Sequence, residues 1–226
     1  MSQLKLFSQV TILLILFSLT TYAQKNGGIY YFLFTIDEQM VNELEIERKG
    51  GGLLSGYSEG LNIPEYVTDS IKSITTQALS DKLKANVQLV YTTTEKGKEY
   101  KTTSMNGGME KESLEDFPFA TFKKAAGQHK LNLYVEIQVS IEDGRNVTVD
   151  AGSSNSRLKP MIDMQVKAYD QNKKVIWQNE VKLKKFDKLK QKTEEDAFIK
   201  VRTGETLQPD MILAMYQQAL AEIIKD

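Results

Sequence analysis

The stretch that most constrains the fold is residues 131–141, with the sequence LNLYVEIQVSI. Every second residue is apolar, and the positions between them carry polar side chains or tyrosine. Successive side chains of a strand point to opposite faces of a sheet, so this alternation predicts a strand with one buried face and one wet face. We expect it in the middle of an antiparallel sheet. Its polar face, with Tyr134, Glu136 and Gln138, is where we would search first for a partner.

The start of the chain predicts export. Lys5 precedes an apolar run at residues 10–19, and the small residues Thr21 and Ala23 occupy the two positions that a signal peptidase recognises. The run is shorter than the roughly 20 residues that span a bilayer. We therefore expect a signal peptide over residues 1–23, cleaved between Ala23 and Gln24, and a periplasmic or secreted product. No later apolar run is long enough to span, so no integral membrane span is expected after cleavage.

Charge and cysteine content exclude several classes of function. The 226 residues include 29 Lys and Arg, 30 Asp and Glu, and no Cys. Nucleic-acid binders usually carry a basic domain, so a nucleic-acid partner is not expected. Without Cys there are no disulfides, thiol nucleophiles, Cys-zinc sites or iron–sulfur clusters. The remaining residues 24–226 are predicted to form a single domain held together by its apolar core.

The other elements follow from local patterns. The apolar run at residues 29–36 predicts a strand buried on both faces. Helical spacing predicts amphipathic helices over residues 64–84, from Pro118 to Gly127, and from Pro209 onward, each with Pro at its first turn. A short strand is expected at residues 87–91.

A hairpin is the best-supported local unit. Residues 162–168 and 175–183 alternate in polarity and flank a turn at residues 170–173. Trp177, the single Trp, either anchors the core or stacks on a ligand. Together the elements predict an α+β fold with a mixed, largely antiparallel sheet and helices packed on one face.

Long polar segments separate these elements. Residues 92–116 and 142–159 are predicted loops, although residues 99–104 could form a hairpin arm with a turn at Asn106-Gly107. The glycine-rich residues 50–60 are also predicted to be a loop. Residues 37–49 fit neither helical nor strand spacing, and residues 197–202 fit a short strand.

The sequence contains no complete motif for nucleotide or metal binding. Gly51 and Gly56 have the spacing of a phosphate-binding loop, but Tyr57 and Ser58 stand where Lys and Ser or Thr are required. His129 is the single His, so a His-rich metal site is excluded, and we expect it at a helix end. We predict no catalytic, cofactor-binding or metal-binding residues and no cofactor.

Charged clusters leave two further possibilities. Paired carboxylates could serve a glycan hydrolase, although solvated loops explain these acids more simply; they are Glu110, Glu112, Glu115, Asp116, Glu142, Asp143 and Asp150. A run of six Lys between residues 182 and 192 would suit an anionic partner, or would keep a strand end soluble.

A weak family resemblance accompanies these patterns. Residues 166–177, VKAYDQNKKVIW, resemble a hairpin found in small bacterial envelope domains, and the order of helices and strands is similar to that of TolB-N-terminal and CsgG-like proteins. The Tyr-Ala-Gln signal end resembles exported proteins of Bacteroidota. The resemblance covers residues 29–226 and implies a partner-binding domain, but it assigns no functional residue. Many such proteins carry a lipid-bearing Cys, which is absent here.

Three functions remain open. The first is a non-enzymatic envelope or secreted module that binds an envelope protein or polymer. The alternatives are a carboxylate-based glycan hydrolase, with exposed aromatics such as Tyr57, Tyr66 and Tyr100, and a small-ligand carrier with an apolar pocket under the helices. The oligomeric state stays open.

The signal peptide can be tested directly. When cells produce the full chain, the purified protein should have the intact mass of a chain that begins at Gln24, and it should appear in the periplasmic or external fraction. Recovery of the uncleaved mass in the membrane fraction would contradict export by cleavage.

Overall fold

The computed structural model describes residues 25–37, 40–41, 44–48, 53–55, 63–103, 111–144, 158–196 and 199–225. The predicted signal peptide and its cleavage site lie outside these residues. Within them, no helix combines the length and hydropathy needed to cross a membrane. The elements are β1 (Lys25–Asp37), β2 (Leu44–Arg48), β3 (Leu53–Ser55), α2 (Glu65–Leu83), β4 (Ala85–Leu89), β5 (Lys111–Ser113), α3 (Phe122–Gln128), β6 (Leu133–Asp143), β7 (Pro160–Asp170), β8 (Val175–Leu183), β9 (Gln191–Glu195), β10 (Ile199–Gly204) and α4 (Pro209–Ile223).

The main sheet is mixed and has the strand order β4-β1-β6-β7-β8, with β5 paired to β1 off this path. This confirms the predicted α+β class. Strand β6 is central, but its surroundings differ from the prediction: it is antiparallel to β7 and parallel to β1. A short turn joins only antiparallel neighbours, whereas the long segment between β1 and β6 permits a parallel pairing that local patterns do not reveal.

Strand β1 confirms the strand predicted at residues 29–36, but its predicted burial on both faces is only partly right, because Leu33 is partly exposed on the face opposite the long helices. Phe32, Phe34 and Ile36 are fully buried in the main core. At its start, Gly27 and Gly28 let β6 and the end of β4 approach closely. A Cβ at Gly28 would lie 2.4 Å from Leu131 Cδ1 and 2.8 Å from Val90 Cγ2.

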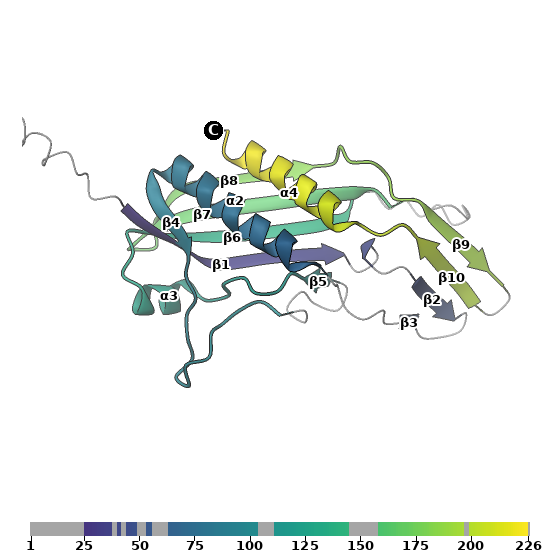
Figure 1. The fold of residues 1–226 in the computed structure, drawn as a ribbon, viewed down its shortest axis with the longest axis horizontal. Helices are drawn as coiled ribbons and strands as arrows, with labels where there is room; N and C mark the ends of the chain where they lie inside the picture. Colours follow the sequence, from purple (N-terminus) through teal and green to yellow (C-terminus); the bar gives the residue numbers. More distant parts are fainter. Residues whose placement is uncertain are drawn as a thin grey trace, which may run out of the picture.

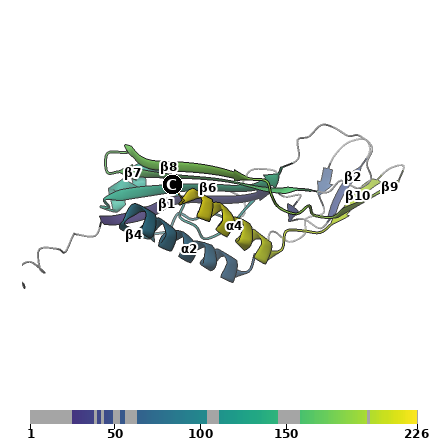
Figure 2. The same ribbon diagram turned by 90° about the horizontal axis from the view of Figure 1, so that it is seen from above.

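The two long helices lie side by side on one face of the main sheet (Figures 1 and 2). Their extents agree with the predicted helices at residues 64–84 and from Pro209 onward. Tyr216 of α4 is fully buried and stacks on Phe34 with 5.7 Å between ring centroids. Its hydroxyl is hydrogen-bonded to Thr75 of α2, so the helices and the sheet share one core.

The prediction that Pro118 opens a helix is wrong. Helix α3 begins four residues later, because Thr121 is a true N-cap that accepts a hydrogen bond from the Lys124 amide at 3.4 Å. The Pro118 carbonyl instead accepts a hydrogen bond from the Phe32 amide of β1 at 2.8 Å, and Pro118 forms an isolated antiparallel bridge with Lys101. Gly127 does not end α3, which continues to Gln128.

The described parts of the polar segment after β4 form backbone pairings, and the loop prediction for residues 92–116 is wrong at β5, which is antiparallel to β1. Thr93 and Glu99 form a bridge across a turn at Gly97, whose φ is 76°. Asn106-Gly107, the turn predicted from sequence, lies outside the described residues.

A second, four-stranded sheet has the order β3-β2-β10-β9 and extends beyond one end of the main sheet (Figure 1). It contains the predicted strand near residues 197–202. The loop prediction for residues 50–60 is wrong at β3, and the ambiguous residues 37–49 contain β2. Strand β2 pairs with β10, which lies more than 100 residues away, and β3 joins the sheet through β2, so local periodicity could not identify them.

The close approach at Gly28 predicts a contrast between two glycines. Gly28→Ala should lower the free energy of unfolding by about 1–3 kcal/mol, because the β-branched Val90 has little room to move. Gly127→Ala meets no atom within 4 Å and should stabilise the protein by up to about 1 kcal/mol. Urea unfolding of both variants measures the difference, and equal effects would contradict the packing at β1.

Candidate functional site: the open face of the main sheet

The candidate site lies on the face of the main sheet opposite α2 and α4, which we call the open face. Figure 2 shows both long helices on the other side of the sheet. The alternation of side chains along each strand, together with the pairing registers, identifies the residues whose side chains lie on this face. From β1, β6, β7 and β8 they include Leu33, Thr35, Glu136, Gln138, Ser140, Glu142, Asp163, Gln165, Lys167, Gln178, Glu180 and Lys182.

A shallow groove of about 390 Å³ crosses this face. It draws lining residues from all four strands: Leu33, Thr35, Gln138, Val139, Ser140, Asp163, Gln165 and Glu180. Because β1 and β6 are packed into the main core on their other side, the floor of the groove is a rigid platform rather than a loop surface.

Hydrogen bonds between side chains hold the groove lining in place. Gln165 Nε2 donates to Glu180 Oε2 at 3.1 Å, and Ser140 Oγ donates to Glu142 Oε1 at 3.0 Å. Lys182 Nζ lies 3.0 Å from Asp163 Oδ2. In each pair the donor is directed at a carboxylate of the same face.

Glu136 organises the end of the open face nearest α3. Its Oε2 accepts hydrogen bonds from the Tyr30 hydroxyl at 3.1 Å and the Tyr169 hydroxyl at 3.3 Å. Its Oε1 accepts from Gln138 Nε2 at 2.9 Å. Burial, and then the Glu136 carboxylate, raise the pKa of both phenols above the usual value. Both tyrosines therefore stay protonated as donors.

Helix α3 covers this end of the face through Phe122. The Phe122 ring lies 5.0 Å from Tyr134 and 5.9 Å from both Tyr30 and Tyr169, centroid to centroid. Tyr134, expected on the wet face, is on that face but only 3% exposed. Sequence alternation identified the face, but it could not show that a short helix would bury one end of it.

Other residues singled out from the sequence lie away from the groove. His129 is the C-cap of α3, and its Nε2 is 3.0 Å from the Tyr91 carbonyl oxygen. Trp177 packs against the main core on the helix side of β8, with Lys82 Nζ 5.8 Å from its ring centroid. This position fits a core anchor better than a ligand-stacking ring. Tyr66 donates to Asp210 at 2.8 Å.

The described members of the predicted acidic clusters make separate local contacts. Asp116 pairs with Lys101 at 3.4 Å, and Asp143 accepts from the Lys159 amide at 3.3 Å. Glu110 and Asp150 lie outside the described residues. Among the residues that the structure describes, no group of three or more His, Cys, Asp or Glu side chains could hold a metal ion.

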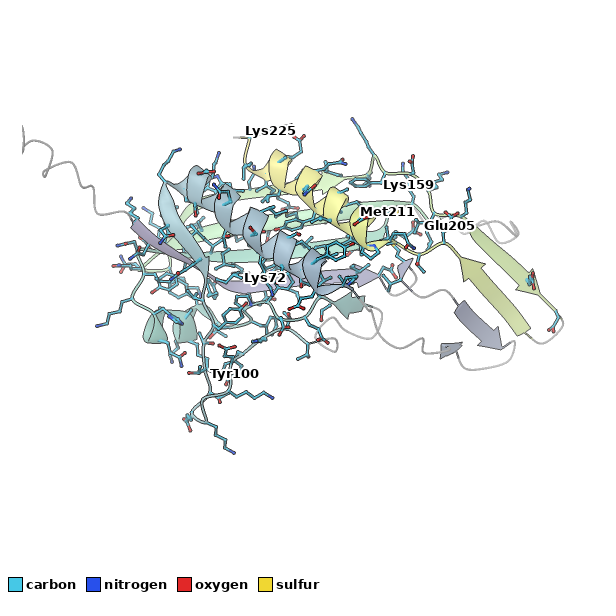
Figure 3. All side chains as sticks on the ribbon, viewed as in Figure 1. Lys72, Tyr100, Lys159, Glu205, Met211 and Lys225 are labelled. Atoms are coloured by element: carbon cyan, nitrogen blue, oxygen red, sulfur yellow. The ribbon has the colours of Figure 1, made fainter. Side chains whose placement is uncertain are left out.

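The lysine run is partly neutralised. Lys182 is paired with Asp163, and Lys190 Nζ lies 3.9 Å from Glu205, which follows β10 (Figure 3). The glycine loop with Gly51, Gly56 and Tyr57 lies outside the described residues.

No protein-family model matches this chain, and no curated protein matches it.

The raised pKa values predict a specific loss of stability in alkali. Unfolded Tyr ionises near pH 10. A phenol with a raised folded-state pKa contributes stability that is complete below that pH and is lost as the pH rises above it. The free energy of unfolding should therefore fall above pH 10. In Tyr30→Phe the decline should be shallower, by up to about 1.4 kcal/mol per pH unit.

Urea unfolding between pH 8 and pH 11 measures this decline. The pH 8 comparison isolates the cost of the lost hydrogen bond to Glu136. Parallel declines for both proteins above pH 10 would show that Tyr30 is not a source of the alkaline sensitivity.

Proposed function

We propose that the protein is an exported, non-enzymatic binding module that docks an envelope protein or polymer on the open face of its main sheet. The observation that carries the proposal is the groove across four strands, which the two long helices leave uncovered. Its polar side chains are already held by hydrogen bonds, so binding costs little side-chain entropy. Export rests on the signal peptide expected from the sequence.

In this groove, the hydrolase alternative would use the two carboxylates of the lining, Asp163 and Glu180. A general acid is normally kept protonated at neutral pH by burial in an apolar pocket. Glu180 is exposed and accepts a hydrogen bond from Gln165, and Asp163 lies against the Lys182 ammonium. Neither side chain lies in an apolar pocket, so these surroundings suit binding better than acid catalysis.

The carrier alternative is also less well supported. The space between the helices and the sheet holds fully buried side chains, among them Tyr216, Phe32 and Phe34. The groove lies on the opposite face and has polar side chains in its lining.

Blocking the groove tests the proposal. Ser140→Tyr places a bulky ring in the groove, and Ser73→Tyr makes the same change on the exposed side of α2. The Ser140→Tyr variant should fail to retain components that the wild-type protein retains from envelope extracts, whereas the Ser73→Tyr variant should still retain them. Thermal unfolding confirms that both variants fold. Equal retention by both variants would contradict docking on the open face.

A further inference from the structure

The groove has more acceptors than available donors. Lining donors of β6 and β7 already direct a hydrogen to a carboxylate: Gln138 to Glu136, Ser140 to Glu142, and Gln165 to Glu180. Each Gln keeps a second N–H, but each also has an amide oxygen, which can only accept, and a carboxylate has about four acceptor sites in its two oxygens. A ligand that approaches this face therefore meets more acceptors than donors.

The charges of the open face also favour a ligand that donates hydrogen bonds, because they are mainly negative. Strands β6, β7 and β8 place four carboxylates there, against the ammonium groups of Lys167 and Lys182. Lys182 lies among three of these carboxylates. Its hydrogen bond with Asp163, followed by the charges of Asp163, Glu142 and Glu180, raises its pKa. The Lys182 ammonium group thus interacts with three carboxylates at once, and negative charges outnumber positive charges on the open face.

We infer that the partner of the open face is a protein segment rich in Arg and Lys. This inference rests on the proposed function and names its partner. Arg suits the site best, because its planar guanidinium has five donors and no acceptor and can bind a carboxylate through two parallel hydrogen bonds. An anionic polymer is repelled by the same charges, and a neutral glycan can donate hydroxyl hydrogens to these acceptors but gains no charge attraction.

The helix side of the protein offers a matched control. In the groove, Asp163 is paired with Lys182 and Glu180 accepts from Gln165. On α2, Asp69 lies 3.5 Å from Lys72 and Asp81 accepts from Gln77 at 3.4 Å. A double substitution at either place removes two negative charges, one from an ion pair with Lys and one from a hydrogen bond with Gln.

The experiment measures the binding of a fluorescent ten-residue oligoarginine peptide by anisotropy, with the protein purified from cells that produce the full chain. Asp163→Asn/Glu180→Gln should weaken binding at least about tenfold, the loss expected when close charge pairs across an interface are removed. Asp69→Asn/Asp81→Asn should change binding less than about twofold. Both double variants change the net charge of the protein by the same amount, so this control measures the effect of the overall electrostatic field alone. An oligoglutamate peptide of the same length should not bind.

The outcomes separate this inference from the proposed function. Equal weakening by both double variants would mean unspecific charge attraction and would overturn the inference. It is also overturned, with the proposed function intact, if Ser140→Tyr abolishes capture from envelope extracts while Asp163→Asn/Glu180→Gln captures like the wild type. That result would assign the groove to a neutral partner such as a glycan. Capture that survives both changes would remove the proposed function itself.

Discussion

The packing of Tyr216 between the sheet and α2 is the interaction on which the rest of the structure depends. Its ring stacks on Phe34 of β1, and its hydroxyl is bonded to Thr75 of α2. A buried hydroxyl without a partner is costly, so this bond fixes how α4, α2 and β1 come together. Burial raises the pKa of Tyr216, so the phenol stays neutral in the core. All of this takes place on one face of the main sheet.

The one-sided core explains why the opposite face is available. A mixed sheet with antiparallel strands tolerates water on one face, provided that its other face is buried. Here the apolar residues of β6 and β7 point into the core, while Gln138, Asp163 and Gln165 remain on the open face. Short α3 then divides this face. Under Phe122 it is aromatic and closed, and beyond Glu136 it is polar and grooved.

Much of the architecture was predictable because the spacing of apolar residues within each segment indicates its secondary structure. The alternation in residues 131–141, the hairpin of β7 and β8 and the two long helices were all found close to their predicted positions. Prediction failed where a distant partner decides the structure. Leu53–Ser55 is a strand because β2 pairs with it, and β2 in turn pairs with β10. The helix expected at Pro118 begins instead after Thr121, because Pro118 binds β1.

The candidate site shows the same division. By itself, the sequence determined the fold class and the polar side of β6, and its balanced charge and lack of Cys removed several chemistries from consideration. Only the tertiary structure decided that β1, β6, β7 and β8 line one groove, that Tyr134 is buried under α3, and that Trp177 belongs to the helix side. The physical reason is that alternation sorts the side chains of one strand onto two faces. Which strands lie side by side, and which face the helices cover, depends on contacts between residues far apart in the chain.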